Sequence, residues 1–187
     1  KVKFWLSIRF NISHLANWTF ITMSSELRVD RILPVDGAPT GGGGSIIQIK
    51  QAFLNTAVTS TATSEEEIST GLRAVITPKF ATSKILMRAA FYFGTSSTEF
   101  TVRFKRNTTL IGTASTMDDQ ADGSFCIGGG SRYCTGSFEF LDSPNSTSAL
   151  TYSAFWRKHS GTMYLNRTWD SGWFHGASSL TVYEVSA

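Results

Sequence analysis

The sequence has little charge and no long apolar run. Only 17% of its 187 residues are charged, the net charge is +3, and no run of Lys and Arg exceeds two residues. Nucleic-acid-binding proteins instead concentrate positive charge in patches. A membrane-spanning helix needs about 20 predominantly apolar residues, and no stretch here is both that long and that apolar. Neither a nucleic-acid partner nor membrane insertion is therefore expected.

Cysteine is also scarce. The only two cysteines, Cys126 and Cys134, flank a glycine run at Gly128–Gly130. Two cysteines do not make a disulfide framework, and their spacing lacks the paired pattern of a zinc site. Two interpretations stay open, a bridge across a hairpin or two reduced thiols in a protein made in the cytoplasm.

Residues that usually carry catalysis are few. The chain has three histidines, His14, His159 and His175. His159 lies in a turn-like segment, where a solvated side chain is the expected role. Asp118, Asp119 and Asp122 cluster in a polar stretch, but the segment lacks the ligand alternation of a calcium loop. No serine-hydrolase, zinc-protease or phosphate-binding motif is present. The sequence predicts no enzymatic activity, no metal and no cofactor.

Serine, threonine and phenylalanine are abundant. Ser and Thr make up about a quarter of the chain, and there are 14 Phe. Such a composition, with Val and Ile, favours strands. Apolar and polar residues alternate with period two in several short segments, and none shows a sustained helical period. We expect Ile47, Ile49 and Phe53 on one face of a first strand, with Gln48 and Lys50 opposite.

The same alternation continues through the chain. In the segment 85–93, Met87 and Phe91 point one way and Arg88 and Tyr92 the other. Asn107 follows a further strand as a turn residue. About eight short strands are predicted, which favours an all-β fold: an antiparallel β-sandwich or jelly roll. The residues expected inside are Ile47, Ile49, Leu72, Ile76, Ile85, Met87, Phe91, Phe100, Val102 and Phe104.

Four segments carry a resemblance to a known family. They are ITPKFATSKILMRAAFYFG (76–94), FLDSPNSTSALTYSAFWR (140–157), GTMYLNR (161–167) and GASSLTVYEV (176–185). Together they resemble a β-sandwich module of tailed-phage virion proteins, especially those of phages that infect cyanobacteria and other aquatic bacteria. The resemblance covers 46–187 and implies a virion component, made in the bacterial host cytoplasm.

The N-terminal part divides into two segments. Residues 1–22 are too polar for a signal peptide or a membrane span, and we interpret them as an upstream or extraneous arm. Residues 23–44 begin with Met23 and read as a leader and glycine-rich linker before the head domain, 45–187. The stripe of Leu27, Val29, Ile32 and Leu33 is too narrow to be buried by one copy alone. The leader is therefore expected to associate with its own copies or with other virion proteins.

One segment suggests contact with a partner. RTWDSGWFHGASS places aromatic rings beside polar groups in a loop bounded by Gly and Ser. Such rings suit the C–H faces of sugars, although loop aromatics also close the ends of sandwiches or fill subunit contacts. The candidate receptor-binding residues are Arg167, Trp169, Asp170, Trp173 and His175.

Together these features lead to a functional expectation. The chain is expected to form a homotrimeric tail-fibre head that attaches to a host-surface glycan. The alternative is a capsid or tail decoration protein with a purely structural, adhesive role.

Overall fold

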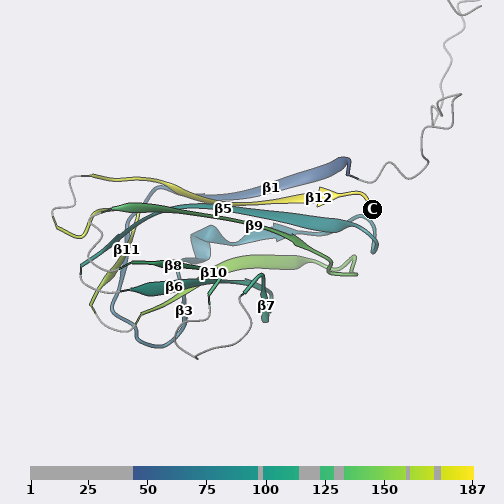
Figure 1. Cartoon of the computed structure of the whole chain (residues 1–187). Helices are drawn as coiled ribbons and strands as arrows, with labels where there is room; N and C mark the ends of the chain where they lie inside the picture. Colours follow the sequence, from purple (N-terminus) through teal and green to yellow (C-terminus); the bar gives the residue numbers. More distant parts are fainter. Residues whose placement is uncertain (1–43, 97–98, 114–122, 129–132, 159–160, 171–173) are drawn as a thin grey trace, which may run out of the picture. The chain divides into compact units, whose positions relative to one another are not determined.

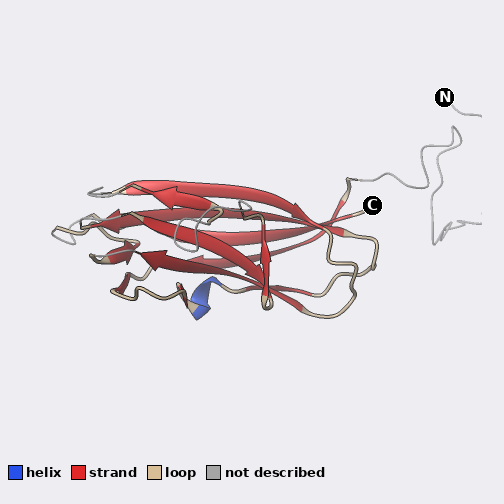
Figure 2. Ribbon diagram, turned by 60° about the horizontal axis from the view of Figure 1, so that its bottom comes forward, coloured by secondary structure: helices blue, strands red, loops and turns tan. Residues whose placement is uncertain are grey.

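The computed structural model of the chain describes residues 44–96, 99–113, 123–128, 133–158, 161–170 and 174–187. They form two antiparallel β-sheets that face each other (Figure 1). Helical structure in the described part is limited to one short 3-10 turn, η1 (Thr70–Leu72), drawn in blue in Figure 2. The prediction of an all-β antiparallel sandwich is thus confirmed.

The first sheet is built around one long strand. Its six strands are β1 (Ile46–Leu54), β2 (Val58–Ser60), β5 (Lys84–Thr95), β9 (Cys134–Asp142), β11 (Met163–Leu165) and β12 (Ser178–Val185). The central strand β5 pairs with β9, β12 and β11. Beyond these, β1 pairs with β12 and β2 pairs with β11.

The second sheet is organised around β10. Its six strands are β3 (Glu66–Glu67), β4 (Ala74–Ile76), β6 (Phe100–Arg106), β7 (Thr109–Ile111), β8 (Phe125–Ile127) and β10 (Leu150–Lys158). Strand β10 pairs with β6, β3 and β4, and β6 in turn pairs with β7 and β8.

The core fills the space between the inward faces of the two sheets. Met87 of β5 is fully buried, whereas its neighbour Arg88 is exposed, as the alternation predicts. The Phe93 ring packs edge-on against Phe100 of the opposite sheet at 5.2 Å between centroids. Burial of each such side chain contributes about 1.5–3 kcal/mol. The predicted core residues that the structure shows buried are Leu72, Ile76, Ile85, Met87, Phe91, Phe100, Val102 and Phe104.

The prediction for the first strand is wrong at Ile49, which is 53% exposed, and Ile47 is only half-buried. Phe53, placed on the same face as these two, is also exposed. A register irregularity between Ile46 and Gln48 shifts the pairing of β1 with β12. In addition, β1 is an edge strand, and both of its faces carry apolar residues. The face with Ala52 and Leu54, which are half-buried, is the one that packs on the core.

The strand number is also higher than expected. The described residues form 12 strands rather than about eight, and six of them have only two or three residues. Strands β2 and β3 lie in the polar stretch 56–70, and β8 follows the polar stretch that contains Asp118, Asp119 and Asp122. The arm 1–22 and nearly all of the leader 23–44 lie outside the described residues.

Candidate functional site

A shallow hollow lies on the outer face of the first sheet. It is open, has a volume of about 220 Å³, and receives residues from β5, from β9 and from the segment before β12. Its lining residues are Ala90, Phe91, Tyr92, Thr135, Gly136, Ser137, Gly176 and Ala177. The register explains why these meet, because Ala90 pairs with Ser137 and Tyr92 with Thr135 across two neighbouring strands.

One residue in the lining of the hollow, Tyr92, stacks on a second tyrosine, Tyr133. Tyr92 and Tyr133 are stacked with 7° between their planes and 6.4 Å between their centroids. Tyr133 is 60% exposed. Gly176 lets the Tyr92 ring lie against the backbone, since a Cβ at residue 176 would be 2.4 Å from Tyr92 Cγ. Tyr92 shares the lining of the hollow with the hydroxyl-bearing residues Thr135 and Ser137.

A buried asparagine holds this region together. Asn166 is fully buried, and its Nδ2 donates to the carbonyl oxygens of Leu54 (2.8 Å) and Thr56 (3.0 Å). Its Oδ1 accepts a hydrogen bond from Ser178 Oγ at 2.6 Å. Ser178 Oγ in turn accepts from the backbone N–H of Tyr92 at 3.1 Å. The backbone of β5 at Tyr92 is therefore linked through Ser178 and Asn166 to the segment at Leu54 and Thr56.

The predicted receptor-binding residues lie next to this hollow in sequence, and the structure describes four of the five. Arg167 and His175 face each other in an isolated antiparallel bridge, which closes the loop just before Gly176. Trp169 is 39% exposed, and Asp170 and His175 are also exposed. Trp173 lies outside the described residues.

Arg167 also contributes an aromatic contact. Its guanidinium lies 5.0 Å from the centre of the Tyr164 ring, within the range of a cation–π interaction. Phe174, which was not among the predicted residues, is 55% exposed. Exposed or half-exposed aromatic side chains therefore come from β5, from β11, from the start of β9 and from the 167–175 loop.

The hollow and the loop lie at one end of the sandwich, and the two ends of the described chain lie at the other. Gly44 N–H donates to the Ser186 carbonyl at 2.9 Å, so the chain enters the sandwich beside its C-terminal residues. Strand β12 runs from the loop end, at Ser178, to this other end, at Val185. In Figure 1, β12 runs along the sandwich towards the end where the C-terminus lies.

The described lining of the hollow consists of uncharged residues. Its lining carries one phenol, two aliphatic hydroxyls and backbone groups, but no carboxylate and no imidazole. Hydrolysis of a glycosidic bond normally needs two carboxyl groups at a defined separation. Aromatic faces beside hydroxyls instead match the C–H faces and hydroxyls of a sugar ring.

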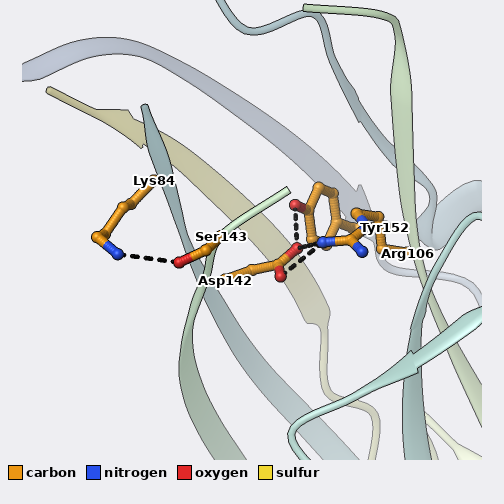
Figure 3. Close-up of polar contacts among 5 residues, drawn as sticks. All are labelled: Lys84, Arg106, Asp142, Ser143 and Tyr152. Atoms are coloured by element: carbon orange, nitrogen blue, oxygen red, sulfur yellow. Dashed lines mark hydrogen bonds and ion pairs between the residues drawn. The ribbon is translucent and has the colours of Figure 1, made fainter. Parts of the chain in front are cut away.

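A polar cluster at the other end of the sandwich joins the two sheets (Figure 3). Both Asp142 carboxylate oxygens lie 2.7 Å from Arg106 Nη1, and Tyr152 Oη donates to Oδ2, also at 2.7 Å. Burial and then the hydrogen bond to Asp142 raise the pKa of Tyr152, so the phenol stays protonated. Lys84 Nζ contacts the neighbouring Ser143 at 2.9 Å. Because every group is already paired, we interpret this cluster as a structural cross-link.

Cys126 and Cys134 are not joined by a disulfide in the structure. Cys126 is exposed and Cys134 is half-buried, and burial raises the pKa of the Cys134 thiol. The remaining candidates, Asp118, Asp119, Asp122, His14 and His159, lie outside the described residues. Within the described part, no three His, Cys, Asp or Glu side chains gather as a metal site would require. There, too, no helix is long and apolar enough to cross a membrane.

Sequence reasoning missed the hollow itself. Tyr92 had the one visible signal, a polar-tipped ring on the outward face of a strand between the buried Phe91 and Phe93. Tyr133 carried no such signal, because it follows residues that belong to a long polar segment. Only the pairing of β5 with β9 brings the two rings together.

Comparisons with known proteins add no assignment to this geometry. Neither the protein-family models nor the curated proteins that were searched match the sequence.

Proposed function

We propose that this chain is the host-binding head of a tailed-phage fibre, which attaches to a bacterial surface glycan through the end of the sandwich that carries the hollow. The observation that carries the proposal is the ring of Tyr92, stacked on the exposed Tyr133, in the lining of a hollow that also carries hydroxyl groups. Support also comes from the sequence resemblance to virion β-sandwich modules. A purely structural decoration protein has no comparable need for exposed aromatic rings around a hollow.

The position of the hollow supports the same proposal. An attachment protein has to present its binding site away from the point where it is anchored. Here Gly44 lies beside Ser186, just after the end of β12, whereas the hollow is lined by Gly176 and Ala177, just before the start of β12. The leader 23–44 then serves as the link to other virion proteins.

A homotrimer completes the proposal. The hollow is shallow, so one copy is expected to bind a sugar weakly, in the millimolar range of about −4 kcal/mol. Three heads on one fibre engage several sugars of the same polysaccharide and multiply the avidity without new contacts.

The test is binding of the full-length protein to an array of immobilised bacterial lipopolysaccharides and capsular polysaccharides. We expect Tyr133→Ala with Trp169→Ala to reduce binding at least tenfold, because two stacking rings together contribute more than about 1.4 kcal/mol. Phe80→Ala is the matched control. Phe80 is 59% exposed, close to the 60% of Tyr133, but it belongs to the turn before β5 at the Gly44 end.

Two outcomes would contradict the proposal. One is a wild-type protein that binds none of the polysaccharides. The other is a double variant that binds them as well as the Phe80→Ala control does. Either result would favour the decoration role.

A further inference from the structure

A row of apolar side chains crosses the outer face of the first sheet. Ile49 pairs with Tyr183, Tyr183 with Leu86, and Leu86 with Leu141, so the row spans β1, β12, β5 and β9. Ile49 is 53% exposed and Leu141 is 51% exposed, while Leu86 and Tyr183 are half-buried. Ile46, which is 58% exposed, pairs with Val185 at the margin of the row. We call these six residues the apolar row.

The next positions along the same strands are polar and paired. Gln51 Nε2 donates to Thr181 Oγ1 at 2.9 Å, and Arg88 forms an ion pair with Glu139 at 2.9 Å. That is the ordinary character of a sheet face in contact with water. Single exposed apolar residues are normal on a protein surface, whereas a contiguous apolar patch marks an interaction surface.

From this arrangement we propose that the apolar row is the surface through which copies of this chain contact one another. The position at which the chain enters the sandwich is the first indication that a second copy of the chain covers the apolar row. Gly44 N–H donates to Ser186 O, and Ser186 N–H donates to Ser45 O, so the 43 residues before Gly44 join the sandwich next to Ile46 and Val185. Copies arranged around an axis parallel to the strands bring these junctions together at one end.

The edge of the sheet gives a second reason. Strand β1 pairs with β12 along one side, and Lys50 is the only charge in its nine residues, IIQIKQAFL. A long, apolar edge strand invites pairing with other chains unless it is covered or charged. A stable interface needs roughly 800 Å² from each partner, which is more than a single row of side chains provides. The contact therefore includes the β1 edge together with the row.

The test is the mass of the full-length protein, measured by analytical ultracentrifugation and mass photometry. We expect one oligomeric species for the wild type, and Ile49→Lys with Leu141→Lys to weaken association about 100-fold or more. Val75→Lys with Leu110→Lys is the matched control. Val75 and Leu110 are 50% and 45% exposed on the outer face of the second sheet, so the added charge and the lost apolar area are similar. The control is expected to keep the wild-type mass, and both variants the wild-type circular dichroism spectrum.

A monomeric wild type at about 10 µM would overturn the proposal, whether the row is bare or covered by upstream residues of the same chain. So would an Ile49/Leu141 variant that keeps the full mass, or a control that dissociates equally. The mass measurement needs no glycan, so its outcome can be separated from that of the binding array. A monomeric variant that still binds polysaccharide with reduced avidity would support both proposals separately.

Discussion

Glu184 is a buried carboxylate that holds a turn in place. Its side chain, which is fully buried, accepts hydrogen bonds from Gln48 Nε2 at 2.6 Å and from the backbone N–H of Lys79 at 2.7 Å. Burial alone would raise the pKa of this carboxyl group, but the hydrogen bonds from Gln48, Lys79 and neighbouring groups outweigh it and lower the pKa. The charged form therefore stabilises the segment between β4 and β5.

This arrangement predicts a defined pH dependence for Glu184. Because the pKa is lower in the folded than in the unfolded protein, the stabilisation is complete above the unfolded value of 4.5 and is lost as the pH falls through the folded value. Glu184→Gln places an amide N–H₂ group against existing donors and is expected to cost about 1–3 kcal/mol at pH 7. The difference from wild type, measured by urea unfolding, should shrink below about pH 4.5.

Glu65 provides the comparison for this measurement. It is a half-buried carboxylate whose pKa is also lowered, although burial opposes this, through its contacts with Lys105 and Arg103. Glu65→Gln should therefore show the same trend with pH, with a smaller loss at neutral pH because the group is more exposed. A Glu184→Gln variant with an equal deficit at every pH would show that the carboxylate charge does not stabilise the turn.

At the scale of an element, the loop before β12 depends on Asn166. The backbone of this residue is left-handed, with φ of 60°, and its side chain has both Leu54 O and Ser178 Oγ as partners. Asn166→Ala removes the hydrogen bonds from buried partners and is expected to lower the free energy of unfolding by about 2–4 kcal/mol. Binding at the hollow should weaken as well, because Ser178 no longer has a fixed orientation beneath Tyr92.

Asn145→Ala is the control for this substitution. Asn145 also has a left-handed backbone, with φ of 48°, but it is exposed. The backbone cost of replacing Asn is therefore similar at the two sites. The difference between the two variants in the free energy of unfolding, measured with urea, then reports the contribution of the buried hydrogen bonds around Asn166. Equal losses for the two variants would mean that the network around Asn166 contributes nothing measurable.

The strands differ in how far the sequence predicts them. In β5 the apolar residues occupy one face, so alternation identifies Met87 as buried and Arg88 as exposed. In β1 both faces contain apolar residues, and alternation alone does not say which face meets the core. Ile49 was assigned inward for that reason. Strands as short as β3 have too few residues for any period to emerge.

The candidate site was predicted only in part, for a related physical reason. A loop rich in aromatic and polar residues is visible in the sequence, and Arg167, Trp169 and His175 could be named from it. The hollow combines Tyr92 with Gly176, and Tyr92 stacks on Tyr133; these three residues lie far apart along the chain. They meet because β5 pairs with β9 and because the loop before β12 passes beside Tyr92, and such long-range pairing has no local signature.

On the scale of the whole molecule, the sandwich has two ends with different chemistry. One end has the stacked tyrosines and the hollow. The other has the chain junction at Gly44, the inter-sheet cluster around Asp142, and the apolar row. We infer that the second end assembles copies of the chain and that the first end presents the binding site, which is the division of roles expected of an attachment head.

The most direct measurement of this central claim is a hydrogen-exchange footprint of the full-length protein, with and without a polysaccharide that it binds on the array. We predict slower amide exchange confined to the segments around Tyr92, Thr135 and Gly176, with no change in β6 and β10 of the second sheet. Protection that falls on the second sheet or on the apolar row, with none at the hollow, would contradict the account.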